Sequence, residues 1–124
     1  MRDFLPFTVS VGNGSRYEII ATAIACGNDL TIAVCGGTLH HVGAISTAYW
    51  EGSHLRLHTY GIPAHRDHLV AEMFAARFAR HFHNHTAVSA GIHIDDTVKT
   101  EIELLLHNSQ DCCELLLSAL AADV

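Results

Sequence analysis

Lysine is almost absent from this chain of 124 residues, in which Lys99 is the single example. Asp and Glu number 13 against 7 for Lys and Arg together, the formal net charge is −6, and no run of basic residues occurs. Nucleic acids and anionic lipid surfaces attract clustered basic side chains. The composition therefore predicts neither a nucleic-acid nor a membrane partner.

Long apolar runs are missing as well. Residues 1–6 lack the apolar core of a signal peptide, and no stretch reaches the roughly 18 apolar residues that a membrane span needs. No Cys-x-x-Cys spacing occurs among the four cysteines, which are Cys26, Cys35, Cys112 and Cys113. We therefore expect a cytoplasmic protein whose thiols are reduced and mostly buried.

Two catalytic signatures are also absent. The chain contains no G-x-S-x-G nucleophile elbow and no H-E-x-x-H metal motif, and its cysteines have no activating neighbours. What the chain has instead is histidine, with 11 examples. Five of these are expected to be solvated surface residues, namely His54, His58, His81, His83 and His85. The lack of a nucleophile favours a ligand-binding protein over an enzyme.

Hydrophobic periodicity predicts an α+β fold in a single domain over residues 1–124. Alternating or β-branched segments, separated by short turns, predict six strands over residues 7–11, 17–26, 30–35, 42–50, 54–60 and 86–94. Short connections favour antiparallel pairing of neighbouring strands. The expected fold is thus a mainly antiparallel sheet of about six strands with two helices packed on it.

The two helices are expected after Pro63 and after the Asp95–Asp96 pair. In the first, an apolar stripe runs from Ala71 to Phe82 at helical spacing and would face the sheet. In the second, Leu104 and Leu115 fall off the main apolar stripe. Two apolar edges on one helix suggest a second packing partner, so a homodimer is expected.

Three loops carry the residues that suit ligand binding. The first pairs glycines with histidines, and backbone N–H groups beside glycine can cradle a phosphate. The second opens a helix, where anions bind well, and the third places His93 beside carboxylates, with Ile92 and Ile94 expected to turn away from it into the core. The candidate binding residues are Gly36, Gly37, His40, His41, Gly43, Ala44, His65, Arg66 and His93.

These loops, taken in order, resemble a known family. The segments are Gly36–Ala44, Pro63–Asp67 opening a helix, and Gly91–Asp96 before a helix. Together they are similar to the LpdD-like chaperones of prenylated flavin, small proteins encoded beside gallate-type UbiD decarboxylases. The resemblance covers most of the chain. It implies a dimer whose fold is similar to proteasome assembly chaperone subunits.

The resemblance further implies a role. It suggests a non-catalytic chaperone that binds reduced prenylated FMN and helps an apo UbiD-type decarboxylase to acquire it. The phosphate would lie at Gly36–Gly37 or near His65, and the ring on Val42, Gly43 and Ala44. Two alternatives stay open at this point: a small histidine-ligated, metal-dependent enzyme, and an assembly factor that grips the decarboxylase without touching the flavin.

Overall fold

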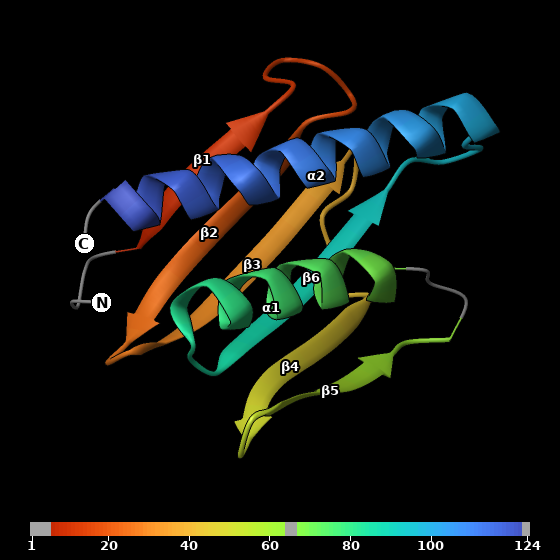
Figure 1. The fold of residues 1–124 in the computed structure, drawn as a ribbon. Coiled ribbons are helices and arrows are strands. Elements are labelled where there is room, and N and C mark those ends of the chain that lie inside the picture. The colour runs from red at the N-terminus through yellow and green to blue at the C-terminus, as the bar shows by residue number, and fades with distance from the viewer. Residues whose placement is uncertain (1–5, 64–66, 123–124) are drawn as a thin grey trace.

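The computed structural model of the chain describes residues 6–63 and 67–122, which form one sheet with two helices on one of its faces (Figure 1). The strands are β1 (Phe7–Val11), β2 (Ile19–Cys26), β3 (Asp29–Gly37), β4 (Ala44–Glu51), β5 (His54–Gly61) and β6 (Thr86–His93). The helices are α1 (His68–Phe82) and α2 (Lys99–Ala122). The expected architecture of six strands and two helices is confirmed.

The sheet has the order β1-β2-β3-β6-β4-β5. Four of its five neighbouring pairs are antiparallel, and β3 and β6 are parallel. The expectation that strands close in sequence pair with each other is wrong for β3 and β4. The chain returns through α1, and β6 then enters between them and pairs with both.

Alternation along the strands decides which side chains meet the helices. In β2, Ile19, Ala21 and Ala23 are buried, and in β3 so are Leu30, Ile32 and Val34. The residues between them point to the opposite side of the sheet because the side-chain period of a strand is two. Figure 1 shows no element over that opposite side among the described residues.

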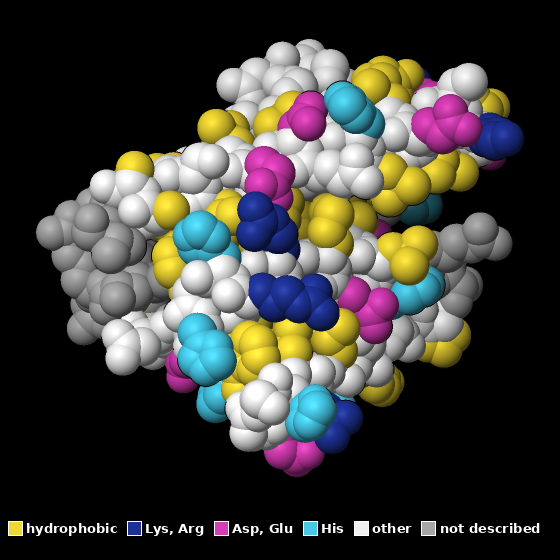
Figure 2. Space-filling model, viewed as in Figure 1, with side chains coloured by type: hydrophobic (Ala, Val, Ile, Leu, Met, Phe, Trp, Pro, Cys, Tyr) yellow, Lys and Arg dark blue, Asp and Glu magenta, His cyan; other side chains and the backbone are white. Residues whose placement is uncertain are grey.

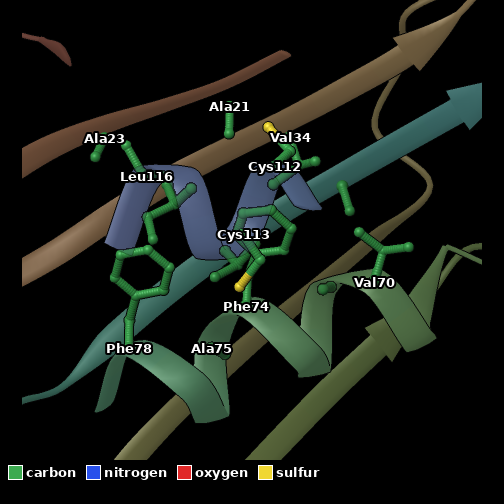
Figure 3. Close-up of a cluster of buried hydrophobic side chains, with 14 of the residues drawn as sticks. Ala21, Ala23, Val34, Val70, Phe74, Ala75, Phe78, Cys112, Cys113 and Leu116 are labelled. Carbon is green, nitrogen blue, oxygen red and sulfur yellow. The ribbon is translucent and has the colours of Figure 1, made fainter. Parts of the chain in front are cut away.

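The core lies between the sheet and the two helices. Phe74 and Phe78 of α1 are fully buried, as are Cys112 and Leu116 of α2 (Figure 3). These are the stripes that helical spacing predicts. Burial of one large apolar side chain stabilises the fold by roughly 1.5–3 kcal/mol. A bidentate contact between Arg77 and Glu114, at 2.9 Å for both atom pairs, joins the two helices at the surface.

Both helices begin later than the sequence predicts. Pro63 precedes α1 by several residues, and the N-cap of α1 is Asp67. Asp95 and Asp96 form a turn before Thr97, and α2 begins at Lys99, so neither aspartate caps it. The carboxylate at this helix start is Glu101, which accepts a hydrogen bond from the Val98 N–H group.

The cysteines and the surface histidines follow the sequence prediction in part. Cys112 and Cys113 are buried, although they are adjacent in a helix, and burial raises the pKa of their thiols to about 11 and about 12. Cys26, by contrast, is exposed. The five histidines expected at the surface are all exposed.

Neither described helix is long and apolar enough to cross a membrane.

Candidate functional site

One edge of the sheet brings together the ends of β3 and β6 and the beginnings of both helices. Because β3 and β6 are parallel, their last residues, Gly37 and His93, lie side by side. Helices α1 and α2 both begin at this edge (Figure 1). Ligands commonly bind where parallel strands end, and the N-terminus of a helix carries partial positive charge.

Asp67 ties three segments together at this edge. Its carboxylate is buried, and Oδ1 accepts a hydrogen bond from the Ile92 N–H group at 3.0 Å. Oδ2 lies 3.1 Å from Nε2 of His41, which it binds. Although Asp67 is the N-cap residue of α1, its side chain makes no capping bond. The carboxylate therefore fixes the loop that carries His41 against the end of β6.

Two glycines make this arrangement possible. A β-carbon on Gly43 would lie 1.8 Å from Oδ2 of Asp67, and one on Gly91 would lie 1.7 Å from the carbonyl oxygen of His41. Neither distance is compatible with any side chain. The group that leaves no room for a side chain at position 43 is the Asp67 carboxylate.

His93 is held next to this cluster. Its Nε2 lies 2.7 Å from Oδ1 of Asp95, and its ring is edge-on to the ring of His41, with 6.1 Å between the ring centroids. Ile94 is buried in the core and Ile92 packs against it, as the sequence predicts, and both residues line one cavity to which His93 also contributes. His93 is the last residue of β6, at the mouth of this arrangement.

The cavity lies under the first half of α2 and has a volume of about 290 Å³. Its walls are mostly apolar, and the polar groups that reach it belong to Asp67, His93, Thr97 and Ser109. The apolar lining comprises Val70, Ile92, Ile94, Ile102, Leu105 and Leu106. An apolar cavity with a few convergent polar groups is the usual form of a small-molecule site.

The cavity continues as a groove between the two helices. A second hollow of about 220 Å³ shares Val70 and Leu106 with the first and extends to Leu69, Met73 and Gln110. Figure 2 shows hydrophobic side chains gathered between the helices at this place. The side chains at the rim are solvent-accessible, with Leu69 exposed by 56% and Ile102 by 47%. The groove can thus accept an apolar group longer than the cavity.

The first half of α2, which covers the cavity, is held in place by Tyr17, just before β2. The Tyr17 hydroxyl donates to Oε2 of Glu101 at 2.9 Å, and the Asn108 amide donates to the Tyr17 carbonyl oxygen at 3.0 Å. The pKa of Glu101 is lowered, first by the hydrogen bond from the Val98 N–H group and then by that from Tyr17. The same contact raises the pKa of Tyr17.

The glycine pair of the first loop has a structural role. Gly36 and Gly37 are the last residues of β3, and a β-carbon on Gly36 would lie 2.4 Å from a methyl carbon of Ile19. The Gly37 N–H group donates to the Glu18 carbonyl oxygen at 3.1 Å. The next N–H group, of Thr38, donates to the carbonyl oxygen of His93 at 2.8 Å. These N–H groups are engaged in the sheet and do not form the phosphate cradle that the sequence suggested.

The remaining candidate residues are divided. His40 is exposed in the first loop, and Ala44 is buried at the start of β4, where it cannot offer a surface to a ring. His65 and Arg66 lie outside the described residues. Of the nine candidates, His41, Gly43 and His93 come together around Asp67, and His93 reaches the cavity.

The sequence analysis placed Asp67 only in the segment that opens a helix, not among the candidate binding residues, and it named no residue of α2 as part of the site. A signal was present, because Ile102 and Leu106 belong to the main apolar stripe of the second helix. Within residues 6–63 and 67–122, no group of three or more His, Cys, Asp and Glu side chains is arranged to hold a metal ion. This part of the chain therefore lends no support to the metal-dependent alternative.

Comparison with known proteins agrees with this picture. A protein named LpdD from Lactiplantibacillus plantarum is 28% identical over 108 residues, which are 86% of this chain and 79% of that protein. A crystal structure of a chaperone complex for yeast 20S proteasome assembly matches with a TM-score of 0.60, covering 93% of this chain and 98% of that chain. Its 13% sequence identity shows the fold alone. The predicted likeness to proteasome assembly chaperones is confirmed.

A family model decides the assignment. The model described as the prenylated flavin chaperone LpdD-like domain matches residues 13–121, which run from before β2 to the last turn of α2 and include the site around Asp67. The chain therefore belongs to the family of LpdD-like prenylated flavin chaperones.

Proposed function

We propose that this protein is a non-catalytic carrier that binds reduced prenylated FMN in the cavity under α2 and delivers it to an apo UbiD-type decarboxylase. The observation that supports the proposal is the apolar cavity of about 290 Å³, with His93 and Asp67 at its polar end. Family membership indicates a chaperone role and a flavin cargo, and the cavity offers a place for the ring.

The residues present fit part of a flavin. A volume of about 290 Å³ lies at the lower limit of small-molecule pockets, which measure roughly 300–1,000 Å³. We therefore assign the ring system and its apolar prenyl addition to the cavity and the adjoining groove. Ile92, Ile94 and Leu106 would cover the faces of the ring, and His93 would hydrogen-bond its polar edge. This replaces the assignment of the ring to Val42, Gly43 and Ala44.

The phosphate belongs outside the cavity. The Asp67 carboxylate in its wall repels a second anion, while both helices begin at the same edge of the sheet (Figure 1), where partial positive charge favours an anion. His40 is exposed in the neighbouring loop. His65 and Arg66 directly precede Asp67 in the chain and keep their predicted role as donors to the phosphate.

A carrier needs no nucleophile and no acid–base pair. Reduced flavins react with oxygen, so an apolar cover that excludes water and limits access to the ring preserves the cargo. The carrier must also release what it binds. We expect a dissociation constant in the micromolar range, which corresponds to about 8 kcal/mol of binding free energy.

Anaerobic titration of the purified protein with reduced prenylated FMN tests the proposal. Saturable micromolar binding is expected, with oxidised FMN bound at least about tenfold more weakly, a difference of roughly 1.4 kcal/mol. Failure to bind the reduced prenylated flavin, or equal binding of both flavins, would overturn the proposal.

Two substitutions on α2 form a matched pair for the same titration. Ile102→Asp places a charge in the cavity wall, whereas Leu115→Asp places one outside the cavity. The two side chains are equally exposed, Ile102 by 47% and Leu115 by 46%, so the two changes should perturb the fold to a similar degree. Ile102→Asp should weaken flavin binding at least about tenfold, and Leu115→Asp should leave it unchanged. Equal effects of the two changes would count against the cavity as the site.

The assembly-factor alternative predicts a different outcome in a delivery assay. Apo-decarboxylase is mixed anaerobically with reduced prenylated FMN, with and without this protein, and the activity gained is measured. A carrier requires that Ile102→Asp reduces activation in step with flavin binding. If that variant binds no flavin and still activates the decarboxylase fully, the protein acts on the enzyme alone.

A further inference from the structure

The first turns of α2 are packed less closely than the rest of that helix. None of residues 99–104 has a buried side chain, whereas from Leu105 to Leu120 every turn places at least one buried side chain in the core. Figure 1 shows that these first turns extend past the ends of β3 and β6. We call residues 99–104 the α2 overhang. A segment with few buried apolar contacts opens at a lower free energy than the core of a fold.

The α2 overhang forms part of the wall of the apolar cavity. Ile102 lines the cavity from the overhang, and Thr97 and Leu105 line it from the residues before and after this segment. Other parts of the wall belong to α1 and to β6, at Val70 and Ile92. Because those elements carry the core, a movement of the overhang would widen the cavity and leave the core in place.

The turn between β1 and β2 holds the overhang in position. The Tyr17 hydroxyl donates to Oε2 of Glu101 at 2.9 Å, and Nε of Arg16 lies 3.8 Å from the same oxygen. The Tyr17 N–H group donates to the Ser15 hydroxyl oxygen at 3.2 Å, so the turn itself fixes Tyr17. The Asn108 amide binds the Tyr17 carbonyl oxygen, two turns further along α2. Of these contacts, those with Glu101 reach the overhang itself.

Ser109 marks a place where α2 can bend. Its hydroxyl is buried and donates to the carbonyl oxygen of Leu105 at 2.7 Å, one turn earlier. A serine that binds the carbonyl group of the preceding turn weakens the helical hydrogen bond there and favours bending. Beyond this point the helix is fixed, because Cys112 is fully buried and Glu114 binds Arg77 of α1 at 2.9 Å. A movement of α2 is thereby confined to its first half.

We infer that the α2 overhang is a lid over the cavity, latched by the hydrogen bond between Tyr17 and Glu101 and hinged between Leu105 and Ser109. Tyr17 does not line the cavity, so it acts as a positioning residue that holds the lid and touches no ligand. The identity of the ligand rests on the proposed function. The lid itself rests on the packing and the contacts of α2.

A lid controls how fast a ligand enters and leaves. The ligand passes only while the lid is open, and the latch is the same with and without ligand. A weaker latch therefore raises the population of the open state equally in both cases. It should speed entry and release by the same factor and leave the affinity unchanged. Residues that shape the cavity itself would change the affinity instead.

Hydrogen exchange of the ligand-free protein, followed by mass spectrometry, tests the lid. Opening breaks the helical hydrogen bonds at the hinge, so the amides of residues 102–109 report it. Tyr17→Phe removes the hydroxyl and should speed their exchange at least about fivefold. Ile32→Val, in the buried centre of β3, is the control. It should speed exchange only where amides open with the whole fold, as expected for residues 112–120.

Two results of this experiment would overturn the lid. Equal acceleration of residues 102–109 by both variants would mean that this segment opens only when the whole chain unfolds. Unchanged exchange in Tyr17→Phe would mean that the hydrogen bond to Glu101 is not a latch. If circular dichroism shows that Tyr17→Phe is unfolded, Glu101→Ala removes the other partner of the bond and should give the same acceleration.

Anaerobic stopped-flow mixing with reduced prenylated FMN measures the effect on ligand exchange. Tyr17→Phe should raise the association and dissociation rate constants together, each at least about fivefold, and change Kd by less than about twofold. A weaker affinity with an unchanged association rate would mean that Tyr17 shapes the site, and the lid would be rejected. If the unmodified protein binds no flavin, the proposed function fails, while hydrogen exchange still decides whether the lid exists.

Discussion

Removal of the Asp67 carboxylate should cost more stability than a surface aspartate can. Asp67→Ala deletes the acceptor of two hydrogen bonds, from the Ile92 N–H group and from Nε2 of His41. Hydrogen bonds to a charged group each contribute about 1.5–3 kcal/mol. Because the side chain makes no capping bond, no loss of a helix cap is added. We expect the free energy of unfolding to fall by about 3–4 kcal/mol.

Asp67→Asn separates the two bonds. The amide keeps an oxygen for the Ile92 N–H group but presents an NH₂ group or a weaker acceptor to His41, so a loss of about 1–2 kcal/mol is expected. Asp111→Ala is the matched control, since Asp111 makes an exposed pair with His107 on α2 at 3.3 Å. That pair should contribute less than about 0.5 kcal/mol.

Urea unfolding, extrapolated linearly to zero denaturant, measures these differences. For a chain of this length the Asp67→Ala loss corresponds to a fall in Tm of about 12–16 °C. The reasoning is refuted if Asp67→Ala loses less than about 1 kcal/mol, or if Asp67→Asn is as damaging as Asp67→Ala. Either result would mean that the carboxylate does not hold the loop against β6.

Three further predictions follow from particular contacts. Gly91→Ala places a β-carbon 1.7 Å from the carbonyl oxygen of His41, so urea unfolding should show a loss of at least about 3 kcal/mol of stability. Gly61→Ala is the control, because a β-carbon there has nothing within 4 Å, and it should leave the stability unchanged. The pKa of Glu101 is lower in the folded chain than in the unfolded chain, so its ionised form stabilises the fold. This stability is fully present above the unfolded pKa and is lost as the pH falls through the folded pKa. Glu101→Gln should therefore flatten the acid limb of a curve of unfolding free energy against pH. Burial raises the pKa of the Cys113 thiol to about 12, so mass spectrometry should find it unmodified by iodoacetamide at pH 7 until urea unfolds the chain.

The types and order of the secondary-structure elements followed from the sequence alone. Period-two and period-3.6 patterns reflect which side chains must be buried, and each pattern is local. The stripe that includes Phe74 and Phe78 identified the buried face of α1 without any knowledge of the sheet. The scarcity of lysine limited the expected classes of partner, and the absence of the two catalytic motifs limited the expected chemistry. The predicted first residues of the two helices were less accurate, because Pro63 and Asp95 are residue types that suit a turn as well as the start of a helix.

Only the tertiary structure decided the strand order and the site. Strand β6 enters between β3 and β4, and pairing between strands so far apart in the chain leaves no local signal. The same insertion carries Ile92 to Asp67, 25 residues earlier in the chain, and so turns a helix-start aspartate into the centre of a cluster. Glycines at positions 43 and 91 were visible as sequence features. What they make room for depends on contacts between distant segments, and those contacts exist only once the sheet has formed.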